Sequence, residues 1–247
     1  MGGSKTPKQQ VADYFLSVHY GICHGPVDAI KGVYIGEKAV YKGATSGDKT
    51  LVISKRDLLG GPKDNGGYEG NIHIFQGGVS QVLPNWIADK MGRRGRVPGF
   101  RGILSMFFAG KNDSGGFYWG SNNPYIRDAW FKIFRTPKGF YPERAVIPRP
   151  DGGADVDVNP AHIIWECATN QEWGSGVEPN MIDLISMKAA ADQLYEERFG
   201  LSLIWTGQQA VEEFIGRVLA HIDGTFDINP RNGLYPLNLI RGDYTVE

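Results

Sequence analysis

The stretch Asn159-Pro-Ala-His-Ile-Ile-Trp-Glu-Cys-Ala-Thr-Asn-Gln-Glu-Trp-Gly-Ser-Gly176 marks a change of character along this chain. Asn159 suits the start of a helix because its side chain accepts a hydrogen bond from a free backbone N–H, and Pro160 fits the first turn. Apolar residues then recur at helical spacing: Ile163, Ile164, Cys167 and Ala168. The stretch therefore predicts a capped helix that buries one face and ends in a polar turn.

The composition changes at the same place. Of the 34 glycines, 26 precede Asn159. Residues 1–158 carry 21 Lys and Arg against 14 Asp and Glu, whereas residues 159–247 carry 5 against 13. The front part is therefore Gly-rich and basic, and the rear part is acidic. Net charges of +7 and −8 indicate that the two parts face different surroundings, or face each other between subunits.

The front part has the patterns of an antiparallel β protein, with short alternating apolar runs between Gly-rich turns. The expected strands cover 13–22, 30–41 (a hairpin that turns at Gly36-Glu37), 51–54, 71–76, 103–109 and 130–135. A short helix is expected over 84–91, and long loops over 59–70 and 111–125. Residues 136–158 are rich in Pro, Gly and Asp, which is typical of a connector.

The rear part is predicted to be helical and then to return to strand. Asp183 caps a helix that ends at Gly200, and a short strand follows over 201–205. A Thr206-x-x-Gln209 capping box opens a third helix, whose apolar stripe runs from Val211 to Ile222. A hairpin over 225–241 begins a further sheet. The prediction is an α+β protein with a tube-like barrel or sandwich (1–150), a helical domain (151–224) and a final β segment (225–247).

Known catalytic and cofactor-binding motifs do not occur in the sequence. There is no Gly-x-Ser-x-Gly elbow, His-Glu-x-x-His, Cys-x-x-Cys or dinucleotide fingerprint. His162 and Glu166 are interpreted as a surface i,i+4 pair, and Cys23 and Cys167 as buried, reduced thiols. We therefore expect no enzyme, no metal and no cofactor. No apolar run is long enough to cross a membrane, and no secretory signal opens the chain.

Two clusters are candidates for contact sites. Arg93, Arg94, Arg96 and Arg101 lie within one flexible, Gly-rich segment. They suit contact with an anion or an acidic partner, although such a cluster is also common on solvated surfaces. Phe117, Tyr118 and Trp119 fall in the expected loop over 111–125, where exposed aromatic side chains indicate a contact surface or a lid over the core.

Three groups of segments together resemble one family. They are His19-Tyr-Gly-Ile-Cys-His-Gly-Pro-Val-Asp-Ala-Ile30 with Val33-Tyr-Ile-Gly-Glu37, Pro98-Gly-Phe-Arg-Gly-Ile-Leu-Ser105 with Gly120-Ser-Asn-Asn-Pro-Tyr125, and Asn159-Pro-Ala-His-Ile-Ile-Trp-Glu166 with Trp173-Gly-Ser-Gly176 and Asn238-Leu-Ile-Arg-Gly-Asp-Tyr244. In this order they resemble the N-terminal portion of the central tail hub (tail tip) protein of long-tailed bacteriophages, and are similar to the host-specificity tail tip protein of lambda-like phages. None of the segments is catalytic.

The resemblance implies a structural subunit of the virion tail tip, made in the cytoplasm of the host bacterium. The hub is expected to be a homotrimer that closes the tail tube. Its expected partners are the tail tube or distal tail protein, the C-terminal end of the tape measure protein, and other tail tip or receptor-binding proteins. DNA would pass through without sequence-specific binding, which gives the arginine cluster a potential contact in the lumen. Family members usually continue well beyond this length, so we expect either a fragment or a division of functions among several proteins.

Two other classes of function stay open. Cell-wall hydrolases do occur on phage hubs, so a tail-associated peptidoglycan hydrolase is the first alternative. Acid pairs for sugar hydrolysis cannot be identified from the sequence, because the separation of the two carboxylates in space decides the chemistry. A glycan-binding module, suggested by Phe117, Tyr118 and Trp119, is the second.

Overall fold

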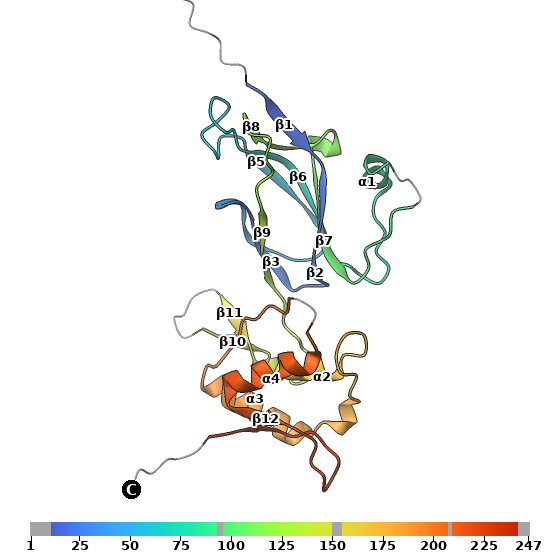
Figure 1. The fold of residues 1–247 in the computed structure, drawn as a ribbon, viewed down its shortest axis with the longest axis vertical. Helices are drawn as coiled ribbons and strands as arrows, with labels where there is room; N and C mark the ends of the chain where they lie inside the picture. Colours follow the sequence, from blue (N-terminus) through green and yellow to red (C-terminus); the bar gives the residue numbers. More distant parts are fainter. Residues whose placement is uncertain (1–10, 93–95, 150–154, 207–208, 242–247) are drawn as a thin grey trace, which may run out of the picture. The chain divides into compact units, whose positions relative to one another are not determined.

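The computed structural model describes residues 11–92, 96–149, 155–206 and 209–241. The chain is a mixed α+β protein, as predicted, and it divides into two compact units, Met1–Arg135 and Thr136–Glu247 (Figure 1). The division falls where the expected connector begins. Each unit has its own hydrophobic core.

The first unit contains a six-stranded antiparallel sheet in which β6 is central. The strands are β1 (Asp13–Leu16), β2 (Val18–His24), β5 (Lys49–Lys55), β6 (Tyr68–Phe75), β7 (Ile103–Ala109) and β8 (Phe117–Ser121). One edge of β6 pairs with β5, and its other edge pairs with β7 and, at Glu69, with β8. β7 pairs in turn with β2, and β8 pairs with β1. The strand predicted over 103–109 is confirmed as β7, which lies between β6 and β2.

A three-stranded sheet, in the order β4-β3-β9, closes most of a barrel against the first sheet. Its strands are β3 (Ala29–Ile35), β4 (Lys38–Thr45) and β9 (Ala129–Phe134). The expected hairpin is confirmed: β3 and β4 turn at Gly36-Glu37, and Gly36 has the left-handed φ of 56° that such a turn favours. The inner faces of both sheets share one core, which includes Ile30, Ile72 and Phe108.

The outer face of the first sheet carries a second, smaller cluster. Ile72 and Ile74 point into the barrel, whereas His73 and Phe75 point outward, which confirms the predicted alternation. Helix α1 (Asn85–Lys90) covers this outer face by packing Ile87 against Phe75 and its neighbours. The short helix predicted over 84–91 therefore exists because it has an apolar surface to cover.

Two predictions for the first unit need correction. The single strand expected over 13–22 is two strands that break at Ser17, because β1 pairs with β8 and β2 pairs with β7. The loop expected over 111–125 contains strand β8 and the short 3-10 helix η1 (Lys111–Asp113). Tertiary pairing with a distant strand outweighs the local Gly-rich sequence there.

The second unit is built on three helices. These are α2 (Pro160–Thr169), α3 (Leu184–Glu196) and α4 (Val211–Ile222). Both predicted caps are confirmed: the Asn159 side chain accepts from the Ala161 N–H, and the Asp183 side chain accepts from the Ile185 and Ser186 N–H groups. Buried side chains from all three helices form one core, with Ala161, Met187 and Phe214 among them.

Short β elements complete the second unit. They are a pair formed by β10 (Val146–Pro148) and β11 (Val156–Val158), and a hairpin of β12 (Gly224–Phe226) and β13 (Leu237–Leu239). Strand pairing within 225–241 is therefore confirmed. The hairpin is short, but Leu237 is buried in the helical core, which provides the support that an isolated hairpin lacks.

Several local predictions for the second unit are wrong. The N-cap of α4 is Ala210 without a side-chain bond, so Thr206-x-x-Gln209 is not its capping box. The apolar run over 201–205 forms only an isolated bridge between Leu201 and Val158. The helical spacing of Ile163, Ile164, Cys167 and Ala168 leaves Trp165 off the predicted buried face of α2, but Trp165 is buried against Phe140.

Candidate assembly surface and polar clusters

The arginine cluster is only partly described. Arg93 and Arg94 lie outside the described residues. Arg96 and Arg101 are exposed in the segment between α1 and β7. The Arg101 Nε donates to the Gln81 carbonyl at 3.3 Å, which fixes the base of that side chain. An anion or lumen contact by these arginines stays a prediction.

The aromatic cluster is not exposed. Phe117, Tyr118 and Trp119 are 0%, 1% and 7% exposed, because all three lie in strand β8. Phe117 and Trp119 point into the barrel core, and Tyr118 packs between Phe15 and the Arg56 guanidinium. The prediction that these residues lie in an exposed loop is therefore wrong. A contact role for their side chains required exposure, which they do not have.

Strand pairing around the barrel is missing in two places among the described residues, between β4 and β5 and between β9 and strands β1 and β2. We call the second of these the seam. The seam is the gap between edge strand β9 and edge strands β1 and β2. Within the described ranges, β9 pairs only with β3, β1 pairs only with β8, and β2 pairs only with β7. Tyr20 of β2 and Phe131 of β9 meet across the seam, with ring centroids 5.8 Å apart. Unpaired strand edges present backbone donors and acceptors that can pair with another chain.

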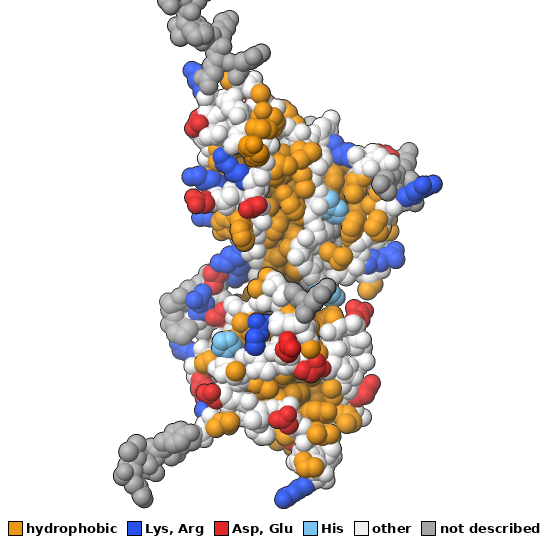
Figure 2. Space-filling view, viewed as in Figure 1, with side chains coloured by type: hydrophobic (Ala, Val, Ile, Leu, Met, Phe, Trp, Pro, Cys, Tyr) orange, Lys and Arg blue, Asp and Glu red, His pale blue; other side chains and the backbone are white. Residues whose placement is uncertain are grey.

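Large apolar side chains lie exposed on the strands that flank the seam. Leu16 of β1 is 44% exposed and Trp130 of β9 is 63% exposed. Figure 2 shows hydrophobic side chains gathered in a strip along the middle of the first unit, over the region where Figure 1 places β9, β1 and β2. An exposed tryptophan on an unpaired edge is characteristic of a protein interface. The alternation over 130–135 predicted this strand, but the sequence gave no signal that it lies at an edge.

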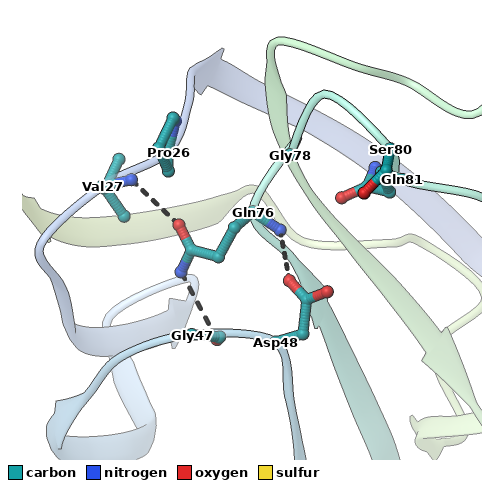
Figure 3. A pocket seen from close by; sticks show the side chains of 8 residues that line it. All are labelled: Pro26, Val27, Gly47, Asp48, Gln76, Gly78, Ser80 and Gln81. Atoms are coloured by element: carbon teal, nitrogen blue, oxygen red, sulfur yellow. Dashed lines mark hydrogen bonds between the residues drawn. The ribbon is translucent and has the colours of Figure 1, made fainter.

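A hollow of about 390 Å³ lies at one end of the β5–β6 pair (Figure 3). Its polar groups are already bonded within the protein. The Gln76 side chain accepts from the Val27 N–H at 2.9 Å and donates to the Gly47 carbonyl, and its own backbone N–H donates to Asp48. These bonds brace three chain segments against one another, so the hollow offers a ligand little that is unsatisfied.

A hydroxyl, an imidazole and a carboxylate are aligned on the outer face of the first sheet. Thr50 Oγ1 lies 2.9 Å from His73 Nδ1, and His73 Nε2 lies 2.7 Å from Asp113 Oδ1. The Asn71 side-chain amide donates to the same Asp113 oxygen at 3.0 Å. This cluster has no signature in the sequence, because its members are far apart in the chain and match no local motif.

The remaining histidines and cysteines considered above lie apart from these features. His162 is fully buried, stacks on Phe140 and donates Nε2–H to the Tyr141 carbonyl, so the predicted surface pairing is wrong. Burial lowers its pKa. Cys167 is buried as expected, but Cys23 is exposed. Within the described residues, no three His, Cys, Asp or Glu side chains are grouped closely enough to hold a metal ion.

Comparison of the chain with protein-family models gives no match, and comparison with curated proteins gives none either. Among the helices of the described ranges, none combines the length and the apolar character needed to cross a membrane. The function is therefore argued from the fold, the seam and the charge of the two units.

Proposed function

We propose that this protein is a structural subunit of a bacteriophage tail hub, which closes the tail tube and connects it to other tail tip components. The observation that carries the proposal is the seam: an antiparallel barrel with unpaired edges and an exposed Trp130 is suited to assembly with other chains. A structural role of this kind requires no catalytic site.

The charge of the two units supports assembly with further copies. The unit Met1–Arg135 has 18 Lys and Arg against 10 Asp and Glu, a net charge of +8. The unit Thr136–Glu247 has 8 against 17, a net charge of −9. Surfaces of opposite sign attract between subunits and select the orientation in which they meet. A homotrimer in which unlike units of neighbouring copies meet would use this separation.

The expected partners follow from the same proposal. The hub would contact the tail tube or distal tail protein, the end of the tape measure protein, and receptor-binding components, and its location would be the virion tail tip. A tail-associated peptidoglycan hydrolase remains the alternative. Incubation with purified peptidoglycan distinguishes the two, because a purely structural subunit releases no soluble fragments.

The proposal is tested by locating the protein and counting its copies. Antibodies against the chain should label the tail tip in electron micrographs of purified virions, and mass photometry of the purified protein should show a trimer. Replacing Trp130 by Ser should convert the trimer to smaller species while thermal stability stays close to that of the original protein, because an exposed side chain contributes little to folding.

Ile185→Ser is the matched control, since Ile185 is 84% exposed but lies on helix α3 of the second unit, whereas the strands of the seam belong to the first unit. This variant should remain trimeric. A monomeric original protein together with unlabelled tail tips contradicts the hub proposal. Loss of the trimer in both variants, or in neither, contradicts the role given to the seam.

A further inference from the structure

We propose that Thr50 is an acyl-accepting nucleophile, with His73 as its general base and Asp113 as the residue that positions the base. The substrate class is carboxylic esters with a good leaving group. The inference concerns an activity separate from assembly, and it stands on the geometry of the outer face of the first sheet.

The hydrogen-bond order in this cluster is set by the carboxylate. In this proposal, a neutral His73 lies beside the Asp113 carboxylate: a carboxylate can only accept, so Nε2 carries the proton and donates it across the 2.7 Å contact. His73 Nδ1 is then left with a free lone pair, which accepts from the Thr50 hydroxyl at 2.9 Å. This is the arrangement that activates a hydroxyl: the group that attacks donates its hydrogen to a base, and a third group orients that base.

The cluster is held by the sheet and by the turn after β7. Thr50 and His73 are directly opposite each other in the β5–β6 register, which fixes the distance between hydroxyl and imidazole. Asp113 is held by Asn71 as well as by His73. Asn112 and Asp113 both adopt left-handed backbone conformations, with φ of 52° and 60°. Asn and Asp adopt this conformation more readily than other non-glycine residues, so the turn places Asp113 beside His73 at little cost.

Burial differs between the base and the nucleophile in the way a reaction requires. His73 is 8% exposed and its ring packs edge-on against Trp86 at 4.9 Å, so water has little access to the imidazole. Thr50 is an exposed residue, so a substrate can approach its side chain from solvent. The nucleophile is thus accessible while its base is held within hydrogen-bond reach.

The reaction proceeds in two balanced steps. In the first, Thr50 Oγ1 forms a bond to the ester carbonyl carbon, its proton moves to His73 Nδ1, and the bond to the alcohol or phenol breaks. The leaving group departs with that proton, which leaves an acyl ester on Thr50. In the second, water attacks the acyl carbon and His73 Nδ1 takes the water proton. The bond from the acyl carbon to Thr50 Oγ1 breaks, His73 returns the proton to Oγ1, and the carboxylic acid departs.

The test uses p-nitrophenyl acetate with the full-length protein. Release of p-nitrophenol should be faster than in buffer, and peptide mass spectrometry should find an acetyl group on Thr50. Thr50→Val should abolish both signals, and Thr50→Ser should retain them, which separates loss of the hydroxyl from loss of folding. Thr225→Val, at an exposed threonine of the second unit, is the matched control and should change neither signal.

The base and its positioning residue have their own readouts. His73→Gln should lower the acetylation rate of Thr50 on the order of 100-fold, the usual contribution of a general base. Asp113→Asn should lower it as well and should also change the ¹⁵N signals of His73, because the proton no longer has a carboxylate to keep it on Nε2. An unmodified Thr50, equal acetylation in His73→Gln, or a His73 protonated on Nδ1 in the original protein would each overturn the proposal and leave the cluster as a brace between strands.

Discussion

Replacement of Asn159 by Ala tests whether the stretch that opens the second unit also holds its helices together. The Asn159 side chain is fully buried and makes two hydrogen bonds. Its oxygen accepts from the Ala161 N–H at 3.1 Å and caps α2, and its amide donates to the Ala191 carbonyl of α3 at 2.9 Å. One side chain therefore both starts one helix and ties it to the next.

The size of the effect follows from those two bonds. Loss of the cap costs about 1 kcal/mol, and loss of a buried hydrogen bond between helices costs about 1 kcal/mol more. The space left by the amide in a packed interior adds to this. We expect Asn159→Ala to lower the free energy of unfolding of the second unit by about 2–3 kcal/mol. Asn159→Ser, which keeps a capping oxygen but is too short to reach α3, should recover about 1 kcal/mol of that loss.

Hydrogen exchange measured along a urea series gives the free energy for each unit separately. Amides of α2 and α3 should lose protection, while those of β6 and β7 in the first unit should not change. Asn229→Ala is the control, because it removes an Asn-to-backbone bond of the same kind at the surface turn of the last hairpin. A loss below about 1 kcal/mol for Asn159→Ala, or an equal loss for Asn229→Ala, would refute the reasoning.

Four further predictions concern glycines and pH. Gly216→Ala should stabilise the protein by up to about 1 kcal/mol in thermal unfolding, because a methyl group there meets no atom within 4 Å of its helical position. Gly70→Ala should destabilise by more than about 1 kcal/mol, since φ is 143° and a Cβ would collide with β7 and β8. Burial lowers the pKa of His162, so the unfolded state binds the proton more tightly. The second unit should be most stable above the ordinary histidine pKa of about 6.5 and weaken as pH falls below it in urea titrations, and His162→Gln should flatten that slope. The hydrogen bond from Arg144 lowers the pKa of Asp192, so a second loss should appear as pH falls through the acidic range, and Asp192→Asn should remove it.

Features that depend on neighbouring residues could be read from the sequence. The caps at Asn159 and Asp183 and the turn at Gly36-Glu37 require only a few consecutive residues with suitable side chains or backbone freedom. The alternation over 71–76 depends only on strand geometry, and both of its faces found apolar partners. For these features, local preference and tertiary structure agree.

Features that depend on distant residues could not be predicted from the sequence. Strand β8 follows Gly115 and Gly116 and contains Gly120, so it resembles a loop locally, but it pairs with β1 from the start of the unit's sequence. Helix α4 begins where its apolar stripe starts to pack, at Val211, and not at the capping-box pattern upstream. In each case burial against a distant element decided the structure.

The seam and the Thr50 cluster were both invisible in the sequence, and for the same physical reason. An edge strand is defined by a partner that is missing, and a cluster on a sheet face is defined by strand register, so neither leaves a local pattern. The proposed roles of the seam and of the Thr50 cluster can nevertheless be tested separately. A Thr50→Val protein that still forms trimers, and a Trp130→Ser monomer that still becomes acetylated on Thr50, would show two independent functions on one barrel. If each variant lost both properties, the first unit would be acting as a single packed body, and neither assignment to particular residues would hold.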